Sequence, residues 1–313
     1  MKILVTGGAG YLGAVLVSLL LDDPDDNEVV VLDSFAHGIP SLLGVAHYPR
    51  LRIVRGDVRD SALVAGLVKS ADVVIALAAV VGQQAAAADK IGAFAVNAEA
   101  IKSLVEMLSP DQRLIYSCTN SGYGMAGEAE CTEESPINPT SEYGLSKVLG
   151  EQYALTHPLT ISLRFATLFG PSPRMRLDLL VNDFVYRAMH REEVLLFEGE
   201  FRRNFLHVWD AADAILWALD NTKTRAGHVF NVGDSRANMS KSSLCGMILR
   251  HIPGFRWSEV VNAGADPDQR DYVVSNTKFE RAAWWIPRYS IDEGILQLKT
   301  AYAMPFEQVA YKN

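Results

Sequence analysis

Near its start the chain carries a glycine-rich turn, in which Gly7, Gly10 and Gly13 recur every three residues, between an apolar run at residues 2–6 and an apolar, helix-like segment at residues 14–21. A strand, a glycine turn and a helix in this order form a cradle for a nucleotide diphosphate, because glycine permits the tight turn and lets the backbone approach the phosphates. The N-terminus of the helix adds free N–H groups and a partial positive charge. We therefore predict a dinucleotide-binding site at the start of this chain.

The next apolar run indicates which dinucleotide this site holds. Residues 28–32 end in Asp33, which lies 20 residues after Gly13. A carboxylate at this distance accepts hydrogen bonds from the adenosine ribose hydroxyls and would repel a 2′-phosphate. Ser34 and the two residues after it supply no arginine that could receive such a phosphate. The sequence therefore predicts NAD as the cofactor.

The remainder of the chain alternates between strand-like and helix-like segments. We expect strands at residues 52–55, 72–77, 113–117, 160–165 and 228–232, and helices at residues 60–69, 91–108, 141–156, 208–220, 240–250 and 290–302. Such alternation is typical of an α/β fold, in which crossover helices join the strands of a doubly wound parallel Rossmann sheet. Pro171 and Pro173 interrupt the pattern. We expect residues 1–170, with about 204–233, to form the NAD-binding Rossmann domain, and residues 171–203 and 234–313 to form a smaller C-terminal substrate-binding lobe.

Composition excludes several other classes of protein. The formal net charge of −8 argues against a nucleic-acid partner. The longest apolar stretch, residues 73–82, is too short to span a membrane. Cys118, Cys131 and Cys245 are far apart and odd in number, which suits a reducing compartment, and the histidines lack metal-ligand spacing. Because a strand-like run begins at the second residue, we also expect no signal peptide. We predict a cytoplasmic enzyme without a metal.

A catalytic pair stands on the helix expected at residues 141–156. Tyr143 and Lys147 are four residues apart, so both side chains lie on one face of the helix. A tyrosine has a reference pKa of about 10, and bringing it to 7 requires about 4 kcal/mol of preferential stabilisation of the phenolate. A nearby lysine ammonium and the positive nicotinamide ring both act in that direction. Thr119 follows the strand at residues 113–117, at the edge of the sheet where ligands bind, and can hydrogen bond to a substrate oxygen.

Together these segments resemble the extended short-chain dehydrogenase/reductases, in particular the nucleotide-sugar epimerase/dehydratase group that includes UDP-glucose 4-epimerase. The resemblance covers nearly the whole chain. It is carried by Thr6–Gly13, Asp33, Gly56–Asp60, Leu77–Ala79, Asn97, the Thr119 segment, Tyr143–Lys147, Arg164–Pro171 and Arg203–Asp213. It implies an NAD-binding Rossmann domain and a smaller lobe that grips a nucleoside-diphosphate sugar.

The resemblance also implies a role for individual residues. Tyr143 is expected to be the catalytic base, Lys147 to bind the nicotinamide ribose and lower the pKa of Tyr143, and Thr119 to orient the reacting hydroxyl. The residues expected to bind the cofactor are Gly7, Gly10, Tyr11, Leu12, Gly13, Asp33, Ser34, Asp57, Val58, Leu77, Ala78, Ala79 and Asn97, together with Tyr143 and Lys147. Those expected to bind the substrate are Asn120, Ser121, Thr167, Asn182, Arg203 and Arg270, and a guanidinium such as that of Arg203 suits a diphosphate because it donates in a fork.

Departures from the group's pattern narrow the reaction. Members that eliminate water from the sugar usually carry Asp-Glu directly after the threonine, whereas this chain has Asn120 and Ser121. Members that epimerise C3 and C5 usually have cysteine at the Ser121 position, and the group's reductases favour NADPH, which Asp33 disfavours. The sequence therefore favours 4-epimerisation through a transient 4-keto sugar. A 4-keto-sugar reductase, another nucleotide-sugar oxidoreductase or 3,5-epimerase, and a non-catalytic NAD sensor are the alternatives.

Relatives in this group commonly dimerise through two helices per subunit. The corresponding segments here are residues 91–108 and 141–156, and both carry more apolar side chains than one face against a sheet requires. These are Ile91, Phe94, Ile101, Leu104, Val105 and Leu108 in the first, and Leu145, Val148, Leu149 and Tyr153 in the second. We therefore expect a homodimer.

Overall fold

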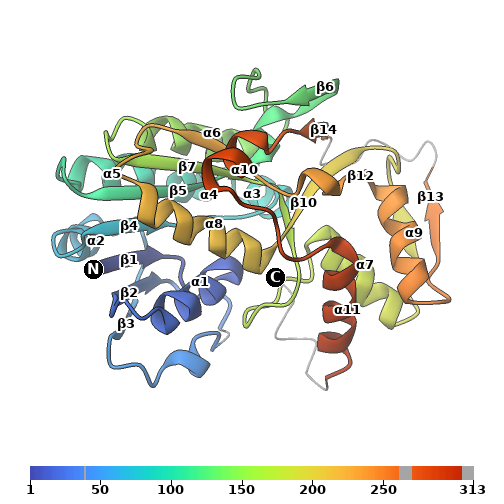
Figure 1. Ribbon diagram of the computed structural model, residues 1–313, viewed down its shortest axis with the longest axis horizontal. Coiled ribbons are helices and arrows are strands. Elements are labelled where there is room, and N and C mark those ends of the chain that lie inside the picture. The colour runs from blue at the N-terminus through green and yellow to red at the C-terminus, as the bar shows by residue number, and fades with distance from the viewer. Residues whose placement is uncertain (39, 261–269, 305–313) are drawn as a thin grey trace.

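A seven-stranded parallel sheet forms the centre of the computed structural model, which describes residues 1–38, 40–260 and 270–304 (Figure 1). The strand order is β11-β7-β5-β4-β1-β2-β3. The strands are β1 (Lys2–Thr6), β2 (Glu28–Asp33), β3 (Leu51–Arg55), β4 (Val73–Ala76), β5 (Arg113–Thr119), β7 (Thr160–Phe165) and β11 (Val229–Val232). This order reverses between β1 and β4, so the carboxyl ends of these two strands flank a crevice of the kind in which a dinucleotide binds.

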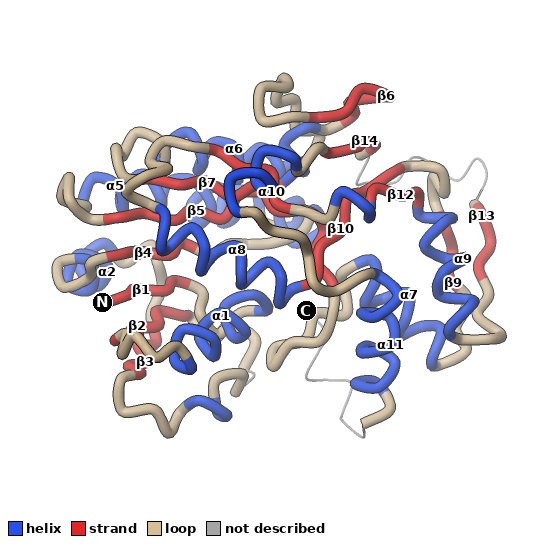
Figure 2. Tube along the Cα trace, viewed as in Figure 1, coloured by secondary structure: helices blue, strands red, loops and turns tan. Residues whose placement is uncertain are grey.

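Helices cover both faces of the sheet, which explains why its central strands read as continuous apolar runs. In β1, Ile3 and Val5 pack into one core and Leu4 into the core on the opposite face. Helices α1 (Tyr11–Asp22) and α8 (Val208–Asn221) lie on the first face, and α2 (Ser61–Val68), α5 (Ala100–Met107) and α6 (Glu142–Ala154) on the second. Figure 2 shows the strands as a layer between these two sets of helices.

A second lobe packs beside the carboxyl ends of the strands, at the right of Figure 1. Its core joins helices α7 (Leu180–Met189), α9 (Lys241–His251) and α11 (Ile291–Tyr302). Short strands complete it: β10 (Arg202–His207) pairs with β8 (Thr167–Phe169) and β12 (Asn238–Ser240), and β9 (Val194–Leu196) pairs with β13 (Trp257–Glu259). Strand β6 (Met125–Cys131) pairs with β14 (Asp271–Val274), so the segment after β5 joins the lobe.

The sequence-based prediction of an α/β doubly wound fold is confirmed, with differences at element boundaries. The strand expected at residues 72–77 ends at Ala76, because the chain turns there toward the crevice. The helix expected at residues 91–108 is divided into α4 (Lys90–Phe94), a π-helical turn (Ala95–Glu99) and α5. Strands β6, β8–β10 and β12–β14 were not predicted; five of them are only three or four residues long and carry little periodicity, whereas β6 and β10 have seven and six residues and were missed.

The expected domain boundaries stay a prediction. Helix α10 (Thr277–Ala283) falls in the range assigned to the C-terminal lobe, yet its Phe279 is buried in the Rossmann core. The short helix α3 (Gln83–Ala88) belongs to the Rossmann domain and contacts α6. Residues 261–269 and 305–313 of the predicted lobe lie outside the described part of the chain.

Among the residues that the structure describes, no helix combines the length and apolar character that crossing a bilayer requires.

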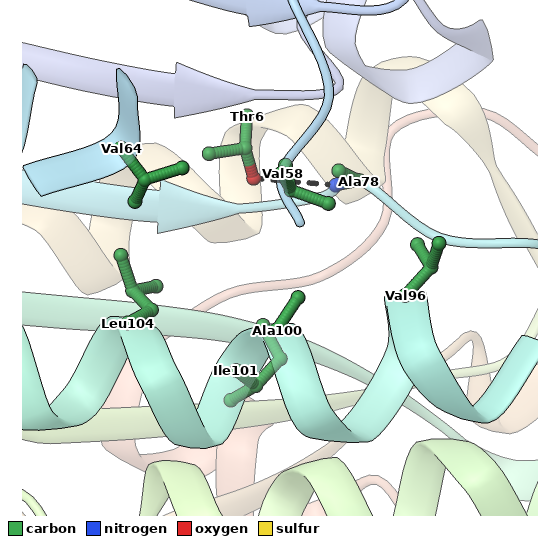
Figure 3. A pocket seen from close by; sticks show the side chains of 8 residues that line it. All are labelled: Thr6, Val58, Val64, Ala78, Val96, Ala100, Ile101 and Leu104. Atoms are coloured by element: carbon green, nitrogen blue, oxygen red, sulfur yellow. Dashed lines mark hydrogen bonds between the residues drawn. The ribbon is translucent and has the colours of Figure 1, made fainter. Parts of the chain in front are cut away.

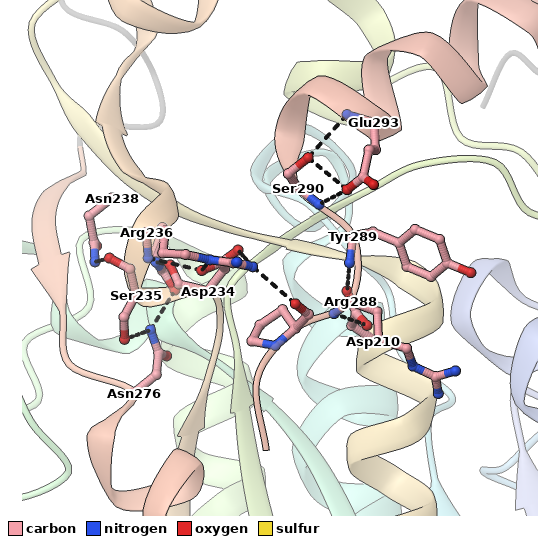
Figure 4. A network of polar contacts seen from close by, with 12 residues as sticks. Asp210, Asp234, Ser235, Arg236, Asn238, Asn276, Arg288, Tyr289, Ser290 and Glu293 are labelled. Atoms are coloured by element: carbon pink, nitrogen blue, oxygen red, sulfur yellow. Dashed lines mark hydrogen bonds and ion pairs between the residues drawn. The ribbon is translucent and has the colours of Figure 1, made fainter. Parts of the chain in front are cut away.

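A polar network ties the connection between α10 and α11 to the Rossmann domain (Figure 4). The buried carboxylate of Asp210, on α8, accepts hydrogen bonds from the backbone N–H groups of Arg288 (2.9 Å) and Tyr289 (3.1 Å). Arg236 donates to the carbonyl of Pro287 (3.0 Å) and is itself held by Asp234. The network fixes the point at which the chain returns from one lobe to the other.

The buried imidazole of His207 stands at the same junction. Its Nδ1 accepts the backbone N–H of Trp209 at the start of α8, and its ring packs against Phe169 and Tyr289. Burial lowers the pKa of His207 to about 4, although Gln297 and the charge of Glu293 act in the opposite direction. The native state therefore holds this ring neutral, whereas the unfolded chain protonates it below its ordinary pKa of about 6.5.

We predict that the free energy of unfolding falls by about 2 kcal/mol between pH 7 and pH 5 because of His207 alone, since the unfolded state binds the extra proton in this range. His207→Asn keeps an oxygen that can cap α8 and removes the ionisation, so it should abolish this part of the pH dependence. Urea unfolding at both pH values measures the effect. The exposed His47→Asn is the matched control, and equal pH dependence of the wild type and His207→Asn would contradict the prediction.

Candidate active site

The glycine turn joins β1 to α1 in the conformation that a diphosphate cradle needs. Gly7 has a φ of +73°, and a Cβ at this position would lie 2.6 Å from the backbone nitrogen of Ala78. A Cβ at Gly13 would lie 2.3 Å from the carbonyl oxygen of Gly7, so neither position accepts a side chain without a shift of backbone. Helix α1 begins after Gly10 without a side-chain cap, which leaves its first N–H groups, including that of Leu12, for a ligand.

Asp33 ends β2 beside this turn. Its two carboxylate oxygens accept the backbone N–H groups of Ala9 (2.9 Å) and Phe35 (2.8 Å). These bonds hold the carboxylate in place, and each oxygen keeps a second lone pair for a ribose hydroxyl. Ser34 is exposed next to it. The geometry fits the role expected for Asp33 in binding the adenosine ribose.

An apolar pocket opens at the carboxyl ends of β1, β3 and β4, and Figure 3 shows its lining. Thr6, Val58 and Ala78 lie together on one side of it, and Oγ1 of Thr6 accepts a hydrogen bond from the backbone N–H of Ala78 at 3.4 Å. The other lining residues come from α2 and the π-α5 segment: Val64, Val96, Ala100, Ile101 and Leu104. The role expected for Val58 and Ala78 in contacting the adenine stays a prediction.

The other residues expected around the cofactor differ in what they contact. Leu77 and Ala79 are partly exposed on either side of Ala78, at the end of β4. Asp57 is paired with Arg59 (2.6 Å), and this hydrogen bond lowers the pKa of Asp57. Asn97 is buried, and its side chain is engaged within the protein.

The amide of Asn97 connects two walls of the crevice. Its Oδ1 accepts the backbone N–H of Val80 (2.8 Å), and its Nδ2 donates to the carbonyl of Val80 (2.9 Å) and to Oγ of Ser146 (2.9 Å). The residue lies in the π-helical turn, an irregularity that often marks a functional site. Asn97 therefore fixes the chain after β4 against the catalytic helix α6.

Thr119, Tyr143 and Lys147 meet at the carboxyl end of β5. Thr119 ends this strand and is nearly buried, and Tyr143 and Lys147 stand on successive turns of α6. In the chain without cofactor, burial raises the pKa of Tyr143, whereas Arg176, Arg270 and a hydrogen bond from Thr119 act to lower it. Burial lowers the pKa of Lys147 to about 8. The residues that sequence analysis named as a catalytic set thus lie in one site.

Asn120 and Ser121 continue directly from Thr119 in a short 3-10 turn, and both are buried. Ser121 accepts hydrogen bonds from the hydroxyl of Thr119 (3.0 Å) and from the guanidinium of Arg270. Neither amide atom of Asn120 has a hydrogen-bond partner in the described part of the chain. A buried amide without a partner is costly, which indicates that it awaits a ligand.

The residues expected to hold the substrate diphosphate are distributed along the lobe boundary. Arg203 is buried, with 3% of its surface exposed. Its guanidinium carbon lies 5.9 Å from the centre of the Tyr272 ring, and its Nη1 donates a hydrogen bond to the carbonyl of Arg202 (3.0 Å). Arg270 lies nearer to the catalytic residues, through its bond to Ser121. Thr167, in β8, is partly exposed.

Asn182 faces the interior of the lobe. Its Oδ1 accepts the backbone N–H of Gly170 (3.0 Å), and its Nδ2 donates to the hydroxyl of Tyr11 (3.3 Å) and to the carbonyl of Arg176 (2.9 Å). The phenol of Tyr11 is also buried and donates to the carbonyl of Gly170 (2.6 Å). In this structure Asn182 and the side chain of Tyr11 join the two lobes, and only the backbone of Tyr11 lies beside the diphosphate cradle.

From the sequence, Arg176 is expected only as part of the segment at residues 171–182 that forms the wall of the substrate pocket. Arg176 is ion-paired with Asp178, and its charge is the largest influence that lowers the pKa of Tyr143. Both residues belong to the segment after Pro171, which turns back over the crevice. Nothing in the spacing of Arg176 from Tyr143 reveals this contact, because 33 residues and a change of lobe separate them.

Comparisons with known proteins agree with this geometry. The sequence profile of the "NAD dependent epimerase/dehydratase family" matches residues 3–233. The low-salt glycan biosynthesis protein Agl12 of Haloferax volcanii is 32% identical over 94% of this chain and 96% of its own length. A putative UDP-glucose 4-epimerase of Methanocaldococcus jannaschii is 27% identical over 94% of this chain and 95% of its own length.

A solved structure shows the same fold with a cofactor present. The dTDP-glucose 4,6-dehydratase DesIV of Streptomyces venezuelae, crystallised with NAD, superimposes with a TM-score of 0.84 at 26% identity and covers 97% of both chains. The glycine cradle, Asp33 and the apolar pocket of this chain fit that cofactor. The chain belongs to the NAD dependent epimerase/dehydratase family, whose enzymes use bound NAD and act on nucleotide sugars.

Proposed function

We propose that this enzyme inverts C4 of a nucleoside-diphosphate sugar through a transient 4-keto intermediate. The observation that carries the proposal is the identity of the two residues after Thr119. Elimination of water across C5 and C6 needs an acid and a base, and the buried side chains of Asn120 and Ser121 supply neither at neutral pH. The set of Thr119, Tyr143 and Lys147 suffices for oxidation and reduction at C4.

Each residue has a distinct task in this reaction. Tyr143, as the phenolate, takes the proton from the 4-hydroxyl, and Thr119 orients that hydroxyl through its own Oγ1. Lys147 supplies the ammonium that favours the phenolate. Bound NAD would supply the hydride acceptor for C4 and the hydride donor for the opposite face of the 4-keto sugar, so no external oxidant would be needed. Tyr143 then gives the proton back to the new 4-hydroxyl.

The nucleotide end of the substrate has candidate ligands in the second lobe. Arg203 and Arg270 are the guanidinium groups placed along the lobe boundary, and either can donate to diphosphate oxygens in a fork. Asn120, with its unpartnered amide, and Ser121 and Thr167 are the candidate contacts to the sugar. Asn182 supports these contacts by holding Gly170 and Arg176 in place.

We predict that the purified enzyme converts a nucleotide sugar to its C4 epimer without added cofactor, because NAD is regenerated in each cycle. Incubation with a panel of uridine-, guanosine- and thymidine-diphosphate sugars, followed by chromatography and NMR, measures this. Tyr143→Phe should reduce the rate by a factor of about 10² to 10⁴, since it removes the base. Tyr153→Phe, on the same helix but outside the site, is the matched control.

Other products would contradict this reaction. A 4-keto-6-deoxy sugar would identify a dehydratase, and steady formation of NADH or consumption of NADPH would identify a dehydrogenase or reductase. A Tyr143→Phe protein with undiminished cellular function would identify a binding module.

We predict that Asp33→Ala narrows the preference for NAD over NADP, because the change removes both the ribose contact and the repulsion of a 2′-phosphate. Binding of each cofactor to the protein freed of its own, measured by calorimetry, tests this. Asp183→Ala is the control carboxylate, since Asp183 lies on α7 and is held by Arg187. Tighter binding of NADP than of NAD to the wild type would refute this interpretation of Asp33.

We further propose a homodimer formed by α4, α5 and α6. Ile91, on α4, is 86% exposed, and Leu145, on α6, is 46% exposed, while Ile101 and Leu104 face the sheet. Large apolar side chains at that exposure on two neighbouring helices favour a two-fold interface.

Light scattering of the wild type at micromolar concentration should give twice the mass of the chain. Leu145→Glu should convert the dimer to a monomer, because two charges would face each other across the axis. Leu296→Glu on α11 is the matched control, since Leu296 has the same 46% exposure. A wild type that is monomeric and fully active would rule out this interface.

A further inference from the structure

A buried ion pair lies directly behind the catalytic helix. Glu151 stands on α6 one turn after Lys147, and Arg164 stands on the adjacent strand β7. The Arg164 guanidinium donates from Nε to both carboxylate oxygens (3.1 and 3.0 Å) and from Nη2 to Oε2 (2.6 Å). The side chain of Arg164 is only 8% exposed and that of Glu151 only 4%.

Stability alone is a poor explanation for such a pair. Removing two charges from water costs free energy that their attraction often fails to recover, and well-packed apolar residues of the same volume are frequently as stable or more so. A buried pair that persists in this place therefore calls for another role. Its position, between the catalytic helix and the catalytic loop, indicates what that role is.

The pair holds both parts of the catalytic set. Arg164 also donates from Nη1 to the hydroxyl of Tyr123 (3.1 Å), which lies in the turn that follows Thr119. Tyr123 in turn donates to Asn231 on the edge strand β11 (2.7 Å). Glu151 anchors the opposite side, since it belongs to the helix of Tyr143 and Lys147. One guanidinium thus connects the loop of Thr119 to the helix of the base.

The carboxylate of Glu151 acts on Lys147 through space. Besides the bonds from Arg164, its Oε1 accepts the hydroxyl of Ser162 (2.6 Å), so its lone pairs are occupied. The Lys147 ammonium lies instead over the ring of Tyr116, 4.4 Å from its centre. Lys147 is therefore free to face the cofactor and Tyr143 while it still feels a fixed negative charge one turn away.

Few other charges act on this lysine. Burial raises the pKa of the Cys118 thiol and of the Tyr116 phenol, so both are neutral at pH 7. The other ionisable groups on α6, β5 and β7 are Tyr143, the Glu151–Arg164 pair, Glu142 and Tyr153 at the two ends of α6, and Arg113 at the start of β5. The charged residues on the helices packed against α6 are solvent-exposed: Asp89, Lys90, Glu99, Lys102 and Glu106.

We propose that Glu151, held by Arg164, is a positioning residue that keeps Lys147 protonated and the Thr119 loop in register with Tyr143. The proposal rests on the catalytic roles of Lys147 and Tyr143 given above. Burial lowers the pKa of Lys147 to about 8, and the charge of Glu151 opposes that effect. Without Glu151, Lys147 would lose its proton near neutral pH, and the phenolate of Tyr143 would lose its support.

Titration of Lys147 by NMR tests this without any substrate. Protein labelled with [ε-¹³C]lysine and loaded with NAD gives a Lys147 signal that is identified by its absence from Lys147→Met. In Glu151→Gln the pKa of Lys147 should fall by about one unit, the size expected for a charge roughly one helical turn away at intermediate dielectric. The upper limb of the activity profile against pH should move down by the same amount.

Two further variants separate the proposal from a loss of folding. Glu151→Gln/Arg164→Met removes both charges together, folds with an apolar side chain in place of the pair, and should give a Lys147 pKa between those of the wild type and Glu151→Gln. Asp210→Asn removes a buried carboxylate elsewhere and should leave Lys147 unchanged. A folded Glu151→Gln protein with an unaltered Lys147 titration would overturn the proposal. Absence of epimerase activity in the wild type would instead overturn the proposed reaction and leave this result standing.

Discussion

The hydrogen bonds of Tyr11 join the two halves of this enzyme. Tyr11 lies in the first turn of α1, within the glycine cradle. Its buried hydroxyl donates a hydrogen bond to the carbonyl of Gly170 (2.6 Å), at the start of the second lobe. Asn182 donates to the same hydroxyl, and Ser172 donates to the Tyr11 carbonyl (2.7 Å). Tyr11 therefore helps to fix the position of the cofactor cradle relative to the second lobe.

Electrostatics divides the site into two regions with different tasks. At the front, the guanidinium groups of Arg176 and Arg270 favour the ionised form of Tyr143, whereas burial opposes it. Behind the helix, the Glu151–Arg164 pair carries no net charge but places its negative end on the side of Lys147. Charges thus act on Tyr143 from the side of the second lobe and on Lys147 from the core behind α6.

Much of this could be predicted from the sequence because the signals are local. The Gly7–Gly13 turn, the acid at the end of β2 and the four-residue spacing of Tyr143 and Lys147 each lie within one supersecondary unit, where backbone geometry fixes the outcome. The contacts of Arg176 with the site and of Arg164 with Tyr123 join distant segments, so they depend on how the lobes pack. Asn97 shows the same limit: its place in the motif was evident, whereas its bonds to Val80 and Ser146 were not.

The buried amide of Asn120 is unfavourable for folding, and such a group points to a ligand-binding role. A buried amide with no partner violates the rule that interior polar groups are hydrogen-bonded, and natural sequences break such rules mainly where a ligand restores them. The neighbouring Ser121 obeys the rule, because Thr119 and Arg270 both bond to it. A carboxylate at position 120 or 121 would pair with Arg270 and bring an acid to the sugar. The amide and hydroxyl found there keep the site polar without adding a carboxylic acid, and the proposed 4-epimerisation rests on this feature.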